Sequence, residues 1–239
     1  MTDKEAPRAV TTVPVVSAER KRIGPLAWLL PTLLMALGLI PLLAGTLRRI
    51  ALSLGAADAS ANGGTEAIPL PALIHILGAS VYVILGALQF SRGFRRRRPA
   101  WHRFAGRVLL AAGLFVALSG LWLNHFVSFP AGSGDLLYVF RLLAGTGMAV
   151  SIVLGFSAIR RRNIPGHRKW MIRAYAIGLG AGTQVFTLGF GEALFGKSEV
   201  GTALLNGAGW AVNLTVAELA IRRRKRDRGS PAGTMGPEL

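Results

Sequence analysis

Apolar residues in this chain fall into six long blocks separated by short polar or basic segments. The blocks lie near residues 24–47, 68–91, 104–127, 136–159, 171–195 and 200–221. Each block is long enough to cross a bilayer as an α-helix, which rises about 1.5 Å per residue. The apolar positions neither alternate nor form a single helical stripe, which indicates lipid rather than water around them. The pattern predicts an all-α integral membrane bundle of six transmembrane helices within residues 23–221.

Polar segments flank this bundle at both ends. Residues 1–22 are polar and aperiodic, which predicts a disordered cytoplasmic tail. Residues 222–239 begin with a run of basic side chains that ends the last apolar block, and then become rich in Gly and Pro. We therefore predict a basic cytoplasmic tail over residues 222–239.

The distribution of charge predicts the orientation of the helices. The net charge is +17, and most Lys and Arg residues lie in the two tails and in the segments 92–107 and 160–173. Basic residues in alternate loops follow the positive-inside rule, so both termini are expected in the cytoplasm of a bacterium and the helices in its inner membrane. The expected partners are the lipid bilayer and anionic lipid headgroups at the cytoplasmic loops. Nucleic acid is not expected, because its binding requires basic residues on one folded surface.

Two basic segments repeat one arrangement. In each, a cluster of arginines precedes a His-Arg pair, a further arginine and a new apolar block. Both copies have the same orientation, which predicts a parallel repeat of two helices plus two helices, residues 68–127 and 136–195, at the core of the bundle. The matching residues are Arg95–Arg98, His102, Arg103 and Arg107 in the first copy, and Arg160–Arg162, His167, Arg168 and Arg173 in the second.

Three histidines are the candidate cofactor ligands. His102 and His167 lie at the inner boundary of their blocks, whereas His75 lies roughly 10 Å inside the outer boundary. Histidines at two depths of a four-helix core resemble the layout of two-haem transmembrane cytochromes b, and the absence of cysteine is compatible with bis-histidine ligation. The alternative interpretation is structural: a His-Arg pair at the membrane boundary also binds lipid phosphate or loop carbonyls.

The remaining intramembrane polar residues predict helix packing rather than chemistry. Arg141 and Glu192 are expected to form an ion pair between neighbouring helices, and Glu218 is expected to pair with Arg222 four residues further on. Arg103, Arg107, Arg168 and Arg173 are expected to contact lipid headgroups. The spacing of Gly178 and Gly182 favours close approach of helix backbones. The sequence contains no paired carboxylates, nucleophile elbow or phosphate-binding loop, so it assigns no catalytic residue.

The chain resembles an uncharacterised family of predicted bacterial multi-pass membrane proteins, of the domain of unknown function 2306 type. The resemblance covers roughly residues 68–220 and implies a membrane topology but no activity, substrate or cofactor. It rests on His75, on Trp101-His102-Arg103 with Gly106-Arg107, and on Gly166-His167-Arg168 with Trp170-Met171-Ile172-Arg173 and Tyr175.

Three functions stay open from the sequence. The most specific is a b-type-haem or related redox module for electron transfer, using His75, His102 and His167. The second is a small-molecule transporter or permease built on the parallel repeat. The third is a non-catalytic membrane assembly or partner subunit whose basic loops bind lipids or other proteins.

Overall fold

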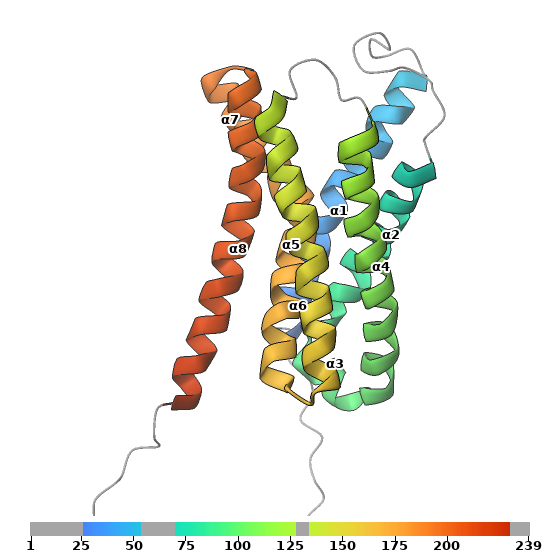
Figure 1. The fold of residues 1–239 in the computed structure, drawn as a ribbon, viewed down its shortest axis with the longest axis vertical. Coiled ribbons are helices and arrows are strands. Elements are labelled where there is room, and N and C mark those ends of the chain that lie inside the picture. Colours follow the sequence, from blue (N-terminus) through green and yellow to red (C-terminus); the bar gives the residue numbers. More distant parts are fainter. Residues whose placement is uncertain (1–25, 54–69, 128–133, 230–239) are drawn as a thin grey trace, which may run out of the picture.

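The computed structural model describes residues 26–53, 70–127 and 134–229, and every regular element in these ranges is helical (Figure 1). The predicted tail over residues 1–22 lies outside the described residues. The helices are α1 (Leu26–Ser53), α2 (Leu70–Gln89), α3 (Arg92–Arg97), α4 (Pro99–Phe126), α5 (Gly134–Arg160), α6 (Ile164–Gly178), α7 (Gly180–Phe195) and α8 (Glu199–Gly229).

Within the described residues, five helices are long and apolar enough to cross a membrane, namely α1, α2, α4, α5 and α8. The predicted block 171–195 is divided instead between α6 and α7, which have 15 and 16 residues. The two helices follow each other at Leu179, whose backbone N–H still bonds the carbonyl of Tyr175 at 3.0 Å. The all-helical prediction is therefore confirmed, and one predicted helix is broken near its middle.

The long helices stand side by side along one axis (Figure 1). We call the end at which α2 and α5 begin the upper end, and the end at which α4 and α6 begin the lower end, as they appear in Figure 1. Antiparallel neighbours α2 and α4 pack together, as do α5 and α6, while α8 packs on α5, α6 and α7. Helix α1 closes the bundle against α2 and α7.

An aromatic and aliphatic layer fills the lower half of the bundle. The rings of Tyr82 and Tyr175 lie 5.7 Å apart, and Phe90 lies 5.0 Å from Tyr175 on the other side. The hydroxyl of Tyr175 donates to the carbonyl of Val83 at 2.9 Å, so this buried polar group is satisfied. Ile152 is the largest fully buried apolar side chain beside them. This layer joins α2, α5 and α6.

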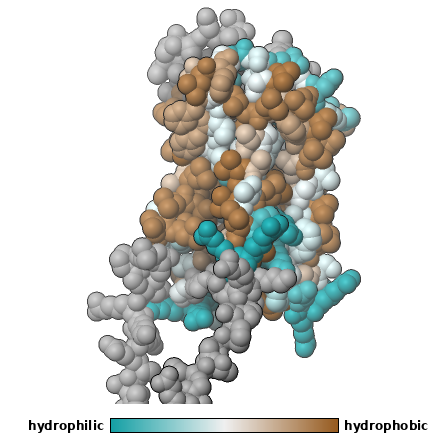
Figure 2. Space-filling view, turned by 90° about the vertical axis from the view of Figure 1, so that its left-hand side faces the viewer, coloured by the Kyte–Doolittle hydropathy of each residue, from teal (hydrophilic) through white to brown (hydrophobic). Residues whose placement is uncertain are grey.

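The outer surface of the bundle is apolar over most of its height. Figure 2 shows a broad hydrophobic body, with hydrophilic residues gathered at the ends. Large side chains point outward from several helices, and Phe115, Leu143 and Phe190 are 59%, 63% and 69% exposed. Soluble monomers rarely expose contiguous apolar surface of this extent, whereas a membrane protein places it against lipid.

The two lower connections differ in structure. Ser91 caps α3, where its hydroxyl accepts the N–H of Phe94 at 3.4 Å, and Pro99 then begins α4. The second connection has no corresponding short helix among the described residues: Arg162 adopts a positive φ of 59°. Asn163 caps α6 by accepting the N–H of Gly166 at 2.9 Å. Two different turns thus lead into α4 and α6.

Candidate functional site

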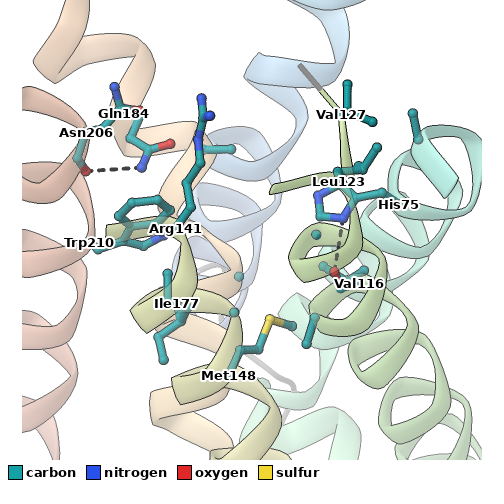
Figure 3. Close-up of a pocket in the computed structure, with 17 residues that line it drawn as sticks. His75, Val116, Leu123, Val127, Arg141, Met148, Ile177, Gln184, Asn206 and Trp210 are labelled. Atoms are coloured by element: carbon teal, nitrogen blue, oxygen red, sulfur yellow. Dashed lines mark hydrogen bonds between the residues drawn. The ribbon is translucent and has the colours of Figure 1, made fainter. Parts of the chain in front are cut away.

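A cavity of about 480 Å³ lies between the helices toward the upper end, and we call it the pocket (Figure 3). Small side chains on five helices leave this space open, because alanine and glycine fill little of the distance between helix axes. These residues are Ala72, Ala117, Gly120, Ala144, Gly145, Gly178 and Ala181. The other apolar lining residues are Val116, Leu123, Val127, Met148 and Ile177. The pocket is therefore mainly apolar.

Five side chains with polar groups line the same cavity: His75, Arg141, Gln184, Asn206 and Trp210. They come from α2, α5, α7 and α8, so distant parts of the chain converge there. Among the described residues that line it, none is Asp or Glu, and Arg141 is the charged one.

His75 is held against α4 by one ring nitrogen. Its Nδ1 lies 3.0 Å from the carbonyl of Val116 and 3.2 Å from the hydroxyl of Ser119. A carbonyl oxygen only accepts, so Nδ1 carries the hydrogen and Nε2 is left as the acceptor of the neutral ring. The second nitrogen points into the pocket (Figure 3). Gly120 makes room for the ring, since a Cβ there would lie 3.1 Å from Cε1 of His75.

Arg141 lies across the cavity from His75, between that ring and the α7–α8 wall (Figure 3). The wall is held by hydrogen bonds: Nε2 of Gln184 donates to the carbonyl of Asn206 at 3.1 Å, and Nδ2 of Asn206 donates to the carbonyl of Thr202 at 2.8 Å. The first bond joins α7 to α8, and interhelical bonds of this type stabilise packing within a membrane; the second lies within α8. The amide side chains are thereby fixed in position at the edge of the pocket.

The lower histidines lie elsewhere, and each binds the long helix that comes before its own in the chain. Nδ1 of His102 is hydrogen-bonded to Oε1 of Gln89 at the end of α2. Nδ1 of His167 donates to the carbonyl of Gly155 on α5 at 2.8 Å. The two imidazoles are within electrostatic range of each other, but neither lines the pocket with His75. The histidines thus hold the lower ends of two hairpins.

Replacing His167 by leucine is expected to lower the free energy of unfolding by about 0.5–1.5 kcal/mol, the usual net contribution of one hydrogen bond. His167→Gln is expected to cost less, because glutamine keeps a donor for the carbonyl of Gly155. Unfolding in mixed detergent micelles measures both values. Equal losses for the two variants would contradict a hydrogen-bonding role.

The acidic side chains of the two predicted ion pairs have other direct partners. Glu218 forms its ion pair with Arg173 of α6 at 2.5 Å, and the predicted partner Arg222 acts on it only through its charge. The guanidinium of Arg173 also lies over the ring of Trp170, 4.7 Å from its centroid. Oε1 of Glu192 accepts from the hydroxyl of Thr202 at 3.2 Å. Among the described residues, no hydrogen bond or ion pair joins Glu192 to Arg141, and Arg141 lines the pocket.

The other predicted lipid-contact arginines lie at the lower end. Arg103 and Arg107 are exposed in the first turns of α4, and Arg168 is half-buried near the start of α6. At the upper end, Nδ1 of the exposed His125 lies 3.1 Å from the hydroxyl of Tyr138. His125 therefore contacts α5, and it does not join His75 at the pocket. Within the described ranges, no group of three or more His, Cys, Asp or Glu side chains could hold a metal ion.

The sequence singled out His75 and Arg141 but did not bring them together. Trp210 and Met148 received no role from the sequence, because an isolated aromatic or methionine in an apolar block looks like any lipid-facing or core residue. Gln184 and Asn206 carried a weak signal, since amide side chains within a span require hydrogen-bonding partners.

These features define a multi-pass helical membrane protein with a largely apolar pocket inside its bundle. The family of predicted membrane proteins DUF2306 matches residues 72–221, and the chain belongs to it. Comparisons with curated proteins and with solved structures gave no match.

Proposed function

We propose that this membrane protein binds a small, largely apolar molecule in the pocket. The observation that carries the proposal is the convergence of Arg141, His75 and the Gln184–Asn206 wall on a cavity otherwise lined by apolar side chains. Ligand sites commonly combine an apolar lining with a few convergent polar groups, in volumes of about 300–1,000 Å³. The cavity of about 480 Å³ falls within that range.

The cost of polar groups inside a membrane supports this proposal. A charged side chain within a helix bundle is expensive, so it is retained where it meets a partner, water or a ligand. Arg141 and His75 line one cavity from α5 and α2 (Figure 3). A bound molecule with a polar head and an apolar body would match both the polar groups and the apolar wall.

The packing below the pocket favours binding over passage across the membrane. Tyr82, Ile152 and Tyr175 are each at most 5% exposed and lie in the core beneath the cavity. A transporter would need to open a path through this layer, where even the hydroxyl of Tyr175 is bonded to a backbone carbonyl. Ligand binding needs no such rearrangement.

The redox proposal gains less from the geometry. The redox prediction used His102 and His167 at the inner level and His75 at the outer level. Only His75 lines the pocket. His102 and His167 bind Gln89 and Gly155 through Nδ1 at the lower end, which leaves Nε2 of each ring as the nitrogen that would hold a haem. A Soret band in the purified protein would favour the redox function over ligand binding in the pocket.

We also propose that the protein crosses a bacterial inner membrane six times with both termini in the cytoplasm. The end-to-end arrangement of α6 and α7 supports the sixth crossing, because the two helices together run from the lower to the upper end (Figure 1). The basic segments support a cytoplasmic lower end. Arg103, Arg107 and Arg168 then lie where anionic headgroups would meet them.

The parallel repeat over residues 68–127 and 136–195 remains part of this proposal. The lower histidines support it, because His102 and His167 occupy the same place in the two hairpins and each binds the preceding long helix through Nδ1. The different turns and the break at Leu179 count as divergence between the two copies.

Filling the pocket tests the proposed function. A variant with Trp210 as its sole tryptophan, the other four being replaced by phenylalanine, reports contact with a bromine atom by fluorescence quenching. ω-Bromodecanol and ω-bromodecanoate serve as probes in nanodiscs of zwitterionic lipid. Ala144→Phe in this background places a ring in the cavity, and we expect it to abolish saturable quenching by both probes.

Leu143→Phe is the matched control. Leu143 is next to Ala144 on α5, but its side chain is 63% exposed on the lipid-facing surface. This variant is expected to keep the quenching of the parent protein. Quenching that is equally strong in Ala144→Phe would show that the probes reach Trp210 from the bilayer and would overturn the proposed function. Helical circular dichroism of each variant checks that the bundle is retained.

A further inference from the structure

We infer that the ligand of the pocket carries an anionic head group, a carboxylate in the simplest case, which binds between Arg141 and His75. The inference rests on the proposed function and specifies the chemical class of the ligand. It predicts an amphipathic monocarboxylate, with its head toward the upper end and its apolar chain among the aliphatic side chains of the pocket.

The charge of the lining residues is the first argument. Within the part of the chain that the structure describes, Arg141 is the charged residue of the wall and no acidic residue lines the cavity. A guanidinium has five N–H donors in a planar fork that matches the two oxygens of a carboxylate, so it can hold a ligand in addition to a protein contact. A cationic ligand would meet like charge, which disfavours it inside an apolar site.

The orientation of His75 is the second argument. Its Nδ1 is bound to the carbonyl of Val116, so the ring position is fixed and Nε2 faces the cavity. When this ring is protonated, Nε2 becomes a donor toward the ligand. An anion between Arg141 and His75 favours that protonated form, because opposite charges stabilise each other in a medium of low dielectric constant. Two positive groups would then face one anionic head.

The shape of the wall is the third argument. Met148 and Ile177 lie lower in the cavity than Arg141, and the ring of Trp210 lies above Ile177 (Figure 3). These side chains form an apolar surface below the polar head site. A chain that extends downward from the head is therefore shielded from water, and each buried methylene contributes about 0.8 kcal/mol.

The matched pair of probes tests the inference in the sole-Trp210 protein. ω-Bromodecanoate and ω-bromodecanol share the chain and the bromine, and they differ in the charge of the head. We expect the acid to quench Trp210 at lower concentration than the alcohol. Arg141→Gln is expected to weaken the binding of the acid by about 10- to 100-fold, the loss of one charge-assisted hydrogen bond, with little change for the alcohol. Arg141→Lys keeps the charge but loses the planar fork, so it is expected to restore part of the affinity.

The outcomes separate this inference from the proposed function. If both probes bind with equal affinity and Arg141→Gln changes neither, the pocket binds ligands without selecting an anion and the inference is overturned. If neither probe gives quenching that Ala144→Phe removes, the proposed function itself fails. Loss of binding by both probes in Arg141→Gln, with normal helical content, would assign Arg141 to the shape of the pocket and would also overturn the anion site.

Discussion

Replacing Gly182 by valine is expected to lower the free energy of unfolding by about 3 kcal/mol, at the upper end of the usual cost of overpacking. Gly182 lies on the face of α7 that meets α1, and a Cβ at this position would collide with the backbone carbonyl of Leu37. A flexible side chain could move aside, but the backbone of α1 cannot move without separating the two helices. The expected result is loss of the α1–α7 contact.

Gly189→Val is the control for this substitution. It lies on the same helix, and a Cβ there meets no heavy atom within 4 Å. The loss of glycine and the gain of a β-branched residue are thus the same in both variants, while the steric contact differs. Thermal unfolding in detergent should show a clearly lower Tm for Gly182→Val alone. Equal Tm values would show that α1 and α7 do not pack closely at Gly182.

Gly178 and Gly182, on either side of the α6–α7 junction, show which contacts the sequence could predict and which it could not. The four-residue spacing of Gly178 and Gly182 predicted close approach of helix backbones, and the contact of Gly182 with Leu37 confirms it. Gly178 meets the side chains of Tyr82 and Met148 instead. The two glycines therefore serve different neighbours, which spacing along one helix does not reveal.

The helical class and most of the helix positions could be predicted because long apolar blocks are a local property of the sequence. The break at Leu179 could not, since no proline marks it and the apolar run continues on both sides. Its local signal is the density of glycine at Gly178, Gly180 and Gly182, which lowers helix stability. Close packing explains the choice of glycine at Gly180, where a Cβ would collide with the ring of Trp210.

The site was less predictable because it depends on which helix faces converge. His75 was singled out correctly as a histidine that needs a polar partner within a span, but its partner is the backbone carbonyl of Val116. A backbone carbonyl that serves as a partner leaves no mark in side-chain patterns. The position of Arg141 could not be predicted either, because its place beside the pocket follows from the packing of α5 against α4 and α8.

Neutralising the lower basic segments is expected to change the protein from one orientation in the membrane to a mixture of two. The variant replaces Arg95–Arg98 and Arg160–Arg162 by glutamine, which removes the cationic clusters of both connections while the apolar helices stay intact. Retention of positive loops on the cytoplasmic side sets the orientation of multi-pass proteins. Each basic residue near an anionic membrane surface contributes about 1 kcal/mol, so the combined change exceeds any single contact in the bundle.

Single cysteines in this naturally cysteine-free chain report the orientation. Ala100→Cys lies at the lower end and Ser198→Cys at the upper end, and a membrane-impermeant maleimide applied to intact cells labels only the outer face. The parent protein should be labelled at Ser198→Cys alone, and the glutamine variant at both sites. The matched control replaces the same arginines by lysine, which keeps the charge and should keep the labelling of the parent. An unchanged labelling pattern in the glutamine variant would contradict this prediction. The tails and the remaining charges would then be sufficient to orient the bundle without the two arginine clusters.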